Sequence, residues 1–386
     1  MSARLQDSRS AADPWLTGAA GALLLIGIVM VASASVSIAD NELGAPFYYL
    51  WRQLVFAVAG LAAALLAYVV PTMYWERLGP LLLTVALLLL VLVLVPGAGH
   101  TVNGSTRWIP LGPVNIQVAE PARLLIIMYL CGYVVRRRDG LARSFGDFLK
   151  PLLVVMLACA LLLMQPDFGA ATVLLAAALG VLLVGGVRLR HFFLLSLTAL
   201  ALFGGLAVTS AYRMKRLTAF LDPWADPYDT GFQLTQSLIA IGRGEWLGVG
   251  LGSSVQKLFY LPEAHTDFMF AVLAEEFGLL GVTIVILLFA VLVGRAFLIA
   301  ERAARAERPF QACLAFAIGS TIGLQALINI GVNMGLLPTK GLTLPLMSYG
   351  GSSLFVTCLS LGLLLRIHEE TRRATGKRRA LRKAVR

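Results

Sequence analysis

Long apolar runs alternate with polar stretches along almost the whole of this 386-residue chain. Most runs are close to the length of about 20 residues that a helix needs to cross a bilayer, and a lipid-exposed backbone must satisfy its own hydrogen bonds. The pattern therefore predicts an all-α polytopic membrane protein with about ten transmembrane helices. The predicted helices cover residues 15–38, 51–70, 78–96, 121–135, 148–164, 168–187, 192–212, 267–294, 310–337 and 348–365.

The connections between these segments differ greatly in length. The longest, residues 213–266, joins the seventh and eighth segments and carries several aromatic residues, so we expect a large, ordered extracytoplasmic loop. Residues 1–14 form a short cytoplasmic N-terminus, and residues 366–386 form a basic, flexible cytoplasmic tail. The whole chain, residues 1–386, is predicted to be one membrane domain.

Composition and charge agree with this class. Hydrophobic residues make up 58% of the chain, and the mean hydropathy is +0.81. The formal net charge is +11, but Lys and Arg concentrate in the stretches that are cytoplasmic when both termini are placed inside the cell. The charge is therefore a signal of membrane orientation and of contact with anionic lipids, and we expect no nucleic-acid partner.

The centres of the ten segments lack Asp, Glu, Lys, Arg and His. Ion-coupled transporters and proton relays usually place such residues near the middle of the membrane. Their absence weighs against a pump or a symporter. The ionisable residues instead gather toward the outer face, at the level of lipid head groups.

The motif LPEAHTDF, residues 261–268, places a carboxylate where the eighth segment begins. If Thr266 caps that helix, Asp267 lies at head-group level, where it reaches the head of a lipid-linked substrate. Glu275 and Glu276 lie nearer the hydrocarbon and are predicted to be structural. The alternative for Asp267 is that it only complements the helix dipole.

The ninth segment carries a polar stripe. Gln325, Asn329 and Asn333 follow one another at intervals of four residues and therefore share one face of a helix. Hydrogen bonds between helices explain such a stripe as well as a polar cavity that opens outward. The sequence leaves these two explanations open.

The connection after this segment, LLPTKGLTLPLMSYGGSS at residues 336–353, resists a regular helix. At membrane depth such a stretch should be buried in protein or should line a cavity. If Ser352 or Ser353 caps the tenth segment, outward-facing N–H groups and Lys340 form a candidate diphosphate cradle. The alternative is a tight turn followed by a capped helix.

Six motifs, in order along the chain, carry a resemblance to a known family. They are NGSTRWIPLG from Asn103, QPDFG from Gln165, FLDPWADP from Phe220, GFQLTQSLIAIGRGEWLGVGLGSSVQK from Gly231, LPEAHTDF from Leu261, and the stretch from GLLPTKG to SYGGSS that starts at Gly335. Together they resemble the SEDS family (shape, elongation, division and sporulation) over nearly the whole chain. The resemblance implies a bacterial inner-membrane peptidoglycan glycosyltransferase. Its substrate would be lipid II, the undecaprenyl-diphosphate-linked disaccharide peptide, polymerised into β-1,4 strands together with a class B penicillin-binding protein.

Within the family, the chain is most similar to the division member. Lys340 in LPTKG, where the elongation member usually has an uncharged residue, and GRGE at residues 242–245 carry this similarity. It implies septal cell-wall synthesis in company with other membrane proteins of the division machinery. The chain departs from the family pattern where Ala170 replaces a threonine, where Phe259 replaces a glutamate, and where the motif ending at Glu120 lacks its first proline.

The resemblance also implies that Asp267 is the essential aspartate. The chemistry agrees, because glycosyl transfer needs a base for the acceptor sugar's 4-hydroxyl while a lipid diphosphate leaves the donor's anomeric carbon, and one such attack inverts that carbon. The leaving group needs positive charge from side chains, from a divalent cation such as Mg²⁺ or Mn²⁺, or from both, and the sequence identifies no metal ligands. The candidate substrate-binding residues are Lys340, Trp108, Arg107, Arg213, Arg216, Glu120, Asn329 and Ser352.

Some alternatives stay open. Trp108 either holds a sugar or packs at the membrane interface. The polarity of the outer half of the bundle also fits a flippase for lipid-linked precursors, and an elongation-type polymerase would share the same chemistry. A non-catalytic division scaffold would use only the loops and the tail.

Overall fold

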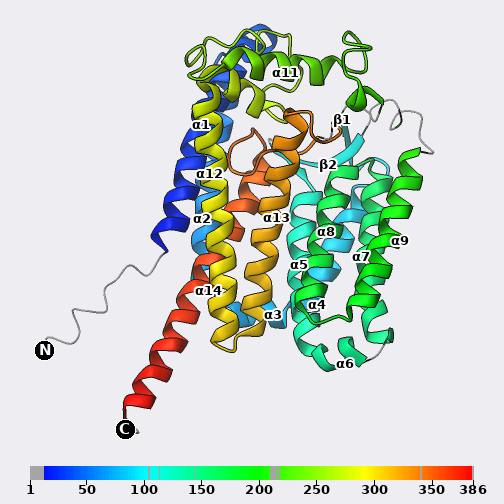
Figure 1. Cartoon of the computed structure of the whole chain (residues 1–386), viewed down its shortest axis with the longest axis vertical. Coiled ribbons are helices and arrows are strands. Elements are labelled where there is room, and N and C mark those ends of the chain that lie inside the picture. The colour runs from blue at the N-terminus through cyan, green and yellow to red at the C-terminus, as the bar shows by residue number, and fades with distance from the viewer. Residues whose placement is uncertain are drawn as a thin grey trace, which may run out of the picture.

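The computed structural model describes residues 13–102, 105–112, 114–143, 145–208, 214, 218–339 and 341–384. Over these residues the chain is mostly helical. Long helices run beside one another, and a short sheet and the helix α11 lie together at one end (Figure 1). The elements are α1 (Pro14–Leu43), α2 (Tyr48–Val69), α3 (Thr72–Arg77), α4 (Gly79–Leu92), β1 (His100–Val102), β2 (Ser105–Leu111), β3 (Val114–Gln117), α5 (Ala119–Arg136), α6 (Arg138–Arg143), α7 (Phe145–Met164), α8 (Phe168–Val184), α9 (Leu189–Val208), α11 (Phe232–Gly244), α12 (Met269–Arg305), α13 (Pro309–Asn333) and α14 (Gly351–Ala384).

Each of the ten predicted apolar segments overlaps one helix. In chain order these helices are α1, α2, α4, α5, α7, α8, α9, α12, α13 and α14. Within the described part of the chain, six helices are long and apolar enough to cross a membrane, namely α1, α2, α7, α12, α13 and α14. The chain is therefore a multi-pass membrane protein.

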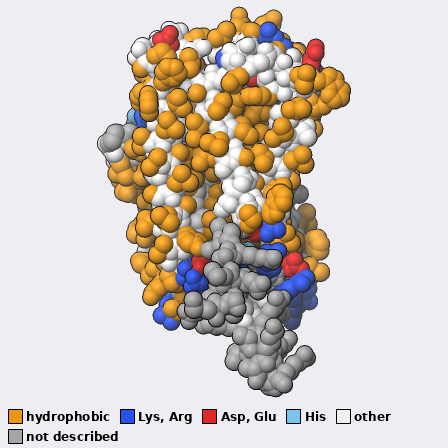
Figure 2. All heavy atoms as spheres, turned by 90° about the vertical axis from the view of Figure 1, so that its left-hand side faces the viewer, with side chains coloured by type: hydrophobic (Ala, Val, Ile, Leu, Met, Phe, Trp, Pro, Cys, Tyr) orange, Lys and Arg blue, Asp and Glu red, His pale blue; other side chains and the backbone are white. Residues whose placement is uncertain are grey.

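The outer surface of the bundle is suited to lipid. Figure 2 shows hydrophobic side chains over most of one long face, with Lys and Arg gathered toward its lower part. On α2, Val55, Val58 and Leu66 each expose about two thirds of their surface, at 65%, 68% and 68%. An apolar surface of this extent is typical of a protein that meets lipid instead of water.

The all-α prediction is wrong in one connection. Residues 100–117 contain a three-stranded antiparallel sheet in the order β1-β2-β3, in which Trp108 pairs with His100 on one side and Gln117 on the other. Gly112, with φ of 65°, lies in the turn between β2 and β3. The strands lie outside the apolar segments, so the hydropathy pattern carried no signal for them.

The predicted flexible tail is instead helical over its described residues. α14 continues beyond the apolar segment as far as Ala384. Arg366 pairs with Glu370 at 2.8 Å, and Arg373 pairs with Glu369, both at a spacing of four residues. Such pairs lie on one face of a helix and stabilise it, which helps the helix to persist after the apolar pattern ends.

α12 is not one continuous helix. At Gly278 the backbone has φ of 62° and ψ of −162°, a conformation that is essentially restricted to glycine. The predicted continuous helix over residues 267–294 is therefore wrong at this point. The break separates a short first part, which packs beside α11, from a long part that carries no charged residue as far as Gly294.

The loop after α11 satisfies the backbone groups that the break exposes. In an unbroken helix, the N–H groups of residues 279 and 280 would donate to the carbonyls of residues 275 and 276. Here these donors pair with the carbonyl oxygens of Glu245 and Trp246, at 2.9 and 3.2 Å. The two carbonyls accept from the N–H groups of Val249 and Gly250, at 2.9 and 3.1 Å. Four backbone hydrogen bonds therefore join the loop to α12.

Glycine is needed on both sides of this junction. A Cβ atom at Gly278 would lie 2.4 Å from the backbone nitrogen of Gly248, and a Cβ atom at Gly248 would lie 2.2 Å from the carbonyl oxygen of Glu276. Neither backbone has room to move without losing the hydrogen bonds. The close approach of the two backbones therefore depends on the absence of side chains.

We expect Gly278→Ala to destabilise the protein. The backbone conformation alone costs about 1–3 kcal/mol for a residue with a side chain, and the contact with Gly248 adds to it. Thermal unfolding of the purified protein in detergent measures the change. Gly294→Ala is the matched control, because it lies in the same helix with no atom within 4 Å of a new Cβ. Equal unfolding temperatures for the two variants would contradict the account of the break.

Candidate functional site

Asp267 lies in a turn that precedes α12. The helix begins at Met269 with Phe268 as its N-cap, and no side chain caps it. The Thr266 hydroxyl instead donates to the carbonyl and the carboxylate of Glu263, at 3.2 and 2.6 Å. The predicted cap at Thr266 is therefore wrong, and Asp267 is placed by the turn and not by helical geometry.

Side chains of α13 hold the main chain of this turn. The carbonyl oxygen of Asp267 accepts from Nδ2 of Asn329 at 2.9 Å and from Nδ2 of Asn333 at 3.1 Å. Oδ1 of Asn333 also accepts from the N–H of Ala271 at 3.2 Å, in the first turn of α12. Both asparagines are buried, so these bonds are made in low-dielectric surroundings, where an unpaired polar group is costly. The turn is thus fixed through its backbone.

The carboxylate of Asp267 faces the connection between α13 and α14. A Cβ atom at Gly341 would lie 2.9 Å from Oδ2 of Asp267, so glycine at this position lets the carboxylate approach the backbone. Lys340 comes directly before Gly341 in the sequence but lies outside the described residues, as do Arg213 and Arg216. The roles of these three cations toward a diphosphate stay predictions.

The polar stripe of α13 also holds that connection. Nδ2 of Asn329 donates to the carbonyl of Leu342 at 2.6 Å, and Nε2 of Gln325 donates to the carbonyl of Thr343 at 3.1 Å. Of the two explanations for the stripe, the structure therefore supports hydrogen bonding. The partners are backbone groups of two irregular segments. In a regular helix these backbone groups would pair within the helix and would not need a side chain as partner.

Glu120 belongs to the same buried framework. Its Oε2 accepts from Nη2 of Arg123 at 2.5 Å, and the same nitrogen donates to Oε1 of Gln325 at 2.8 Å. Glu120 and Arg123 are both buried in α5. Removal of one partner from a buried ion pair of this kind strongly destabilises the fold, because the other charge is left buried and unpaired. Glu120 and Asn329 therefore belong to the buried framework that supports the site. That either residue contacts substrate directly stays a prediction.

Arg107 and Trp108 lie side by side in sequence on β2. The Arg107 guanidinium donates to the carbonyls of Gln165 and Pro166, at 3.2 and 2.6 Å, and its Nε lies 3.9 Å from Oδ2 of Asp167. It therefore ties the sheet to the turn between α7 and α8. Trp108 is half-buried on the same strand. That either residue binds substrate stays a prediction.

Ser352 joins the sheet to α14. Its Oγ accepts from the N–H of Gln117 at the end of β3, at 2.9 Å. Because α14 begins at Gly351, Ser352 and Ser353 lie inside its first turn. The predicted cap at either serine is therefore wrong, although Ser352 does lie at the start of the helix, facing the sheet.

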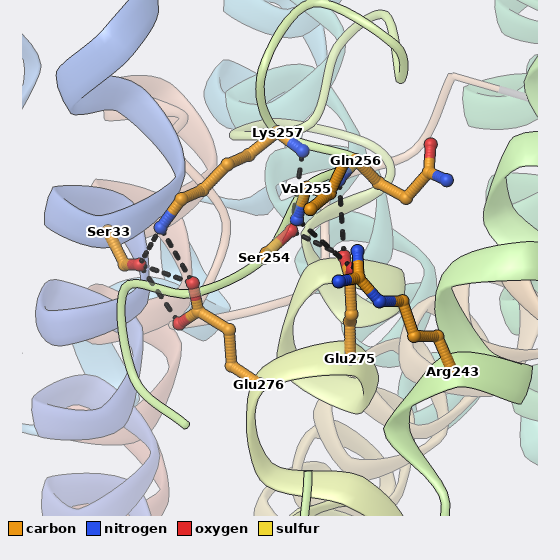
Figure 3. A network of polar contacts seen from close by, with 8 residues as sticks. All are labelled: Ser33, Arg243, Ser254, Val255, Gln256, Lys257, Glu275 and Glu276. Carbon is orange, nitrogen blue, oxygen red and sulfur yellow. Dashed lines mark hydrogen bonds and ion pairs between the residues drawn. The ribbon is translucent and has the colours of Figure 1, made fainter. Parts of the chain in front are cut away.

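Sequence reasoning missed the residues that surround Glu275 and Glu276 (Figure 3). Both carboxylates are buried, yet each has charged and polar partners from the loop 213–266 or from α1. Two of these partners, Arg243 and Lys257, stand in a motif that the sequence singled out. Two adjacent acidic residues near the start of an apolar helix indicate that two cationic residues lie close by. They do not indicate which residues these are.

An aromatic cluster covers the other side of the turn. The His265 ring lies 4.7 Å from the Tyr49 ring and 5.7 Å from the Tyr349 ring, measured between centroids. The N–H of Tyr349 donates to the carbonyl of His265 at 3.0 Å. Burial lowers the pKa of His265 below its usual 6.5, against the opposing effect of Glu263 and Glu42. The neutral form of this histidine is therefore the one that fits the fold.

We expect Asn333→Ala to destabilise the protein, because it removes the buried side-chain hydrogen bonds to the carbonyl of Asp267 and the N–H of Ala271. Each such hydrogen bond contributes about 0.5–1.5 kcal/mol to stability. Thermal unfolding in detergent measures the loss. Leu327→Ala, at a 63% exposed position of the same helix, is the control and should change stability by no more than about 0.5 kcal/mol. A loss no larger than that of the control would contradict the role given to Asn333.

We expect acid to destabilise the fold in a way that depends on His265. Above pH 6.5 this histidine is neutral in both the folded and the unfolded chain; below it, the unfolded chain takes up a proton that the folded chain resists. Stability therefore falls as the pH drops below about 6.5. Unfolding temperatures of His265→Asn, measured across this range, should fall less steeply than those of the wild type. Identical slopes would contradict the burial of a neutral histidine.

Comparison with known proteins gives a consistent result. The family of cell cycle proteins that comprises FtsW, RodA and SpoVE matches residues 15–373. A probable peptidoglycan glycosyltransferase FtsW of Thioalkalivibrio sulfidiphilus is 59% identical over 359 residues, which cover 93% of this chain and 90% of that protein. A protein of the same name from Nitrosococcus halophilus is 57% identical, with 93% of each chain covered.

Solved structures agree with the sequence relatives. One similar chain comes from work on the "structural coordination of polymerization and crosslinking by a peptidoglycan synthase complex"; it has a TM-score of 0.75 and 32% identity, with 93% of this chain and 98% of that chain covered. The rod shape determining protein RodA of Thermus thermophilus has a TM-score of 0.68 and 31% identity, with 94% and 98% covered. The chain therefore belongs to the FtsW/RodA/SpoVE family, which is the SEDS family that its motifs resemble.

Proposed function

We propose that this chain is a peptidoglycan glycosyltransferase that polymerises lipid II into β-1,4 glycan strands during septal cell-wall synthesis. The observation that carries the proposal is the arrangement of Asp267. Its backbone is held by two buried asparagines, and its carboxylate faces Gly341, next to Lys340 in the sequence. Relatives that are 59% and 57% identical over most of their length are named probable peptidoglycan glycosyltransferase FtsW.

The reaction that this site would perform is a single displacement. The 4-hydroxyl oxygen of the acceptor sugar forms a bond to the anomeric carbon of the donor, and the bond from that carbon to the diphosphate oxygen breaks. The hydroxyl proton passes to the Asp267 carboxylate, and the lipid diphosphate leaves with the electron pair. Attack from the opposite face inverts the carbon, so an α-linked donor gives a β-linked product.

Positive charge must stabilise the departing diphosphate. Lys340, Arg213 and Arg216 are the proposed sources. Within the described residues, no three His, Cys, Asp or Glu side chains come together. A Mg²⁺ or Mn²⁺ ion held by one or two carboxylates and by the substrate's own phosphates would be compatible with the proposal. Such sharing between one carboxylate and a substrate is a usual arrangement for magnesium.

The proposed membrane placement has ten spans, both termini in the cytoplasm, and the loop 213–266 on the extracytoplasmic side of the bacterial inner membrane. It is supported by the arrangement in Figure 1, in which α11 and the sheet lie at the end of the bundle opposite to the end of α14. The concentration of Lys and Arg in the proposed cytoplasmic stretches agrees with this orientation.

The proposed partners are lipid II, a class B penicillin-binding protein and other membrane proteins of the division septum. Support for the second partner comes from the similar chain that belongs to a peptidoglycan synthase complex, where polymerization is coordinated with crosslinking. A polymerase and a crosslinking enzyme act on successive steps of the same product, so their association brings new strands directly to the second enzyme.

We expect Asp267→Asn to abolish polymerisation of lipid II while the protein still folds, because an amide cannot take up the hydroxyl proton. Loss of a general base typically lowers the rate by about 10²–10⁴-fold. Purified protein with labelled lipid II, with and without a class B partner, measures glycan length and rate.

Asp229→Asn is the matched control, because Asp229 is an exposed aspartate of the same loop. It should polymerise lipid II at the wild-type rate. Normal glycan strands from Asp267→Asn would overturn the assignment of the base. Movement of lipid II across vesicles by the wild type, without any polymer, would overturn the proposed function in favour of a flippase.

A further inference from the structure

Glu275 and Glu276 are adjacent, buried carboxylates at the end of the first part of α12, and they bind different partners (Figure 3). Glu275 accepts from Nη1 of Arg243 at 3.1 Å and from the Ser254 hydroxyl at 2.5 Å. It also accepts from the N–H groups of Val255 and Gln256, at 3.1 and 3.3 Å. Four donors, two of them backbone groups, therefore fix Glu275 to the loop 213–266.

Glu276 has a smaller set of partners, which join different parts of the chain. Its Oε1 lies 2.8 Å from Nζ of Lys257, and both of its oxygens accept from the Ser33 hydroxyl, at 2.7 and 2.9 Å. Nζ of Lys257 also donates to Oγ of Ser33 at 2.9 Å. Three side chains from α1, the loop and α12 thus form a closed triangle, which we call the Lys257 junction.

The junction is buried. The side chain of Lys257 is 7% exposed and that of Glu276 is fully buried, so neither charge is stabilised by water. A buried charge without its partner is strongly unfavourable, whereas an intact pair with additional hydrogen bonds is tolerated. The pair therefore holds Lys257 against α1 and α12 much more firmly than a surface ion pair would.

Lys257 also marks the start of the segment that carries Asp267. Residues 258–268, called the strap here, follow it directly and contain two non-glycine residues with positive φ, namely Phe259 at 65° and Glu263 at 56°. Such conformations are strained and persist only where the surroundings hold them. The far end of the strap is held at His265 and Asp267 by hydrogen bonds from α13 and from the connection after it. The near end is held at Lys257 by the junction, and the residues just before it, 254–256, are held by Glu275.

We propose that Lys257, with Glu276 and Ser33, is a positioning site that sets the place of Asp267 for glycosyl transfer. The inference rests on the proposed function. Its physical basis is that a strained strap keeps one shape only while both ends are fixed, and that a misplacement of about 1 Å at a reacting group lowers the rate by about a hundredfold. Lys257 acts through the strap and does not itself touch the reacting atoms.

The test measures strap mobility and catalysis separately in the full-length protein. Hydrogen exchange of the amides in residues 258–268 reports the strap, and lipid II polymerisation reports kcat and KM. In Lys257→Met we expect faster exchange in the strap and a fall in kcat of about a hundredfold, with KM changed by less than about threefold.

The double variant Lys257→Met with Glu276→Gln distinguishes positioning from stability. Removing both charges restores a compatible buried environment, so the unfolding temperature should recover toward that of the wild type. The charged contact that joins Lys257 to α1 and α12 is still missing, so fast exchange and low kcat should persist. Recovery of kcat together with stability would overturn the proposal, as would wild-type exchange in the strap of either variant.

Arg243→Met is the matched control, because it removes the other ion pair of the same helix turn. Glu275 keeps its hydroxyl donor and both backbone donors, and Arg243 is 45% exposed, so strap exchange and kcat should stay near the wild-type values. A loss equal to that of Lys257→Met would contradict the specific role of the junction. If the wild-type protein made no glycan, the proposed function would fail, while the exchange data would still decide whether Lys257 holds the strap.

Discussion

Backbone polar groups that leave a regular helix within a membrane protein must find partners in the protein, and this structure depends on how two irregular segments meet that requirement. At Gly278 the partners are backbone groups of the loop after α11. In the connection between α13 and α14 the partners are the side chains of Gln325 and Asn329. In both places the hydrogen-bond partner lies far away in sequence or on another element. The hydrogen bonds that satisfy the local backbone groups therefore also fix the tertiary structure.

Asp267 lies between these two irregular segments, and that position suits the catalytic role proposed for it. Asn329 and Asn333 bind its carbonyl and also the segments on either side of it. The backbone that carries the carboxylate is therefore held by a buried framework. Preorganised groups of this kind do not have to rearrange during the reaction, which is the main way in which protein dipoles and charges lower a barrier.

Hydropathy predicted where the long helices lie, because the length of an apolar run is set by the membrane. It could not predict the sheet at residues 100–117 or the break at Gly278, since both depend on partners outside the apolar pattern. The motif LPEAHTDF singled out Asp267 through the family resemblance, and its role as the base stays a prediction. The predicted cap at Thr266 is wrong, because the Thr266 hydroxyl donates to Glu263. The stripe of α13 was recognised, while its partners were not, because a polar stripe does not reveal which backbone it will meet.

The central claim is that the Asp267 carboxylate takes the proton from the acceptor sugar. An experimental structure of the protein with a lipid II analogue in the acceptor position tests it most directly. The account predicts that the acceptor 4-hydroxyl lies within hydrogen-bond distance of a carboxylate oxygen of Asp267, at about 2.6–3.2 Å. An acceptor hydroxyl that bonds instead to Glu263 or to another base, with both carboxylate oxygens of Asp267 beyond hydrogen-bond distance, would contradict it.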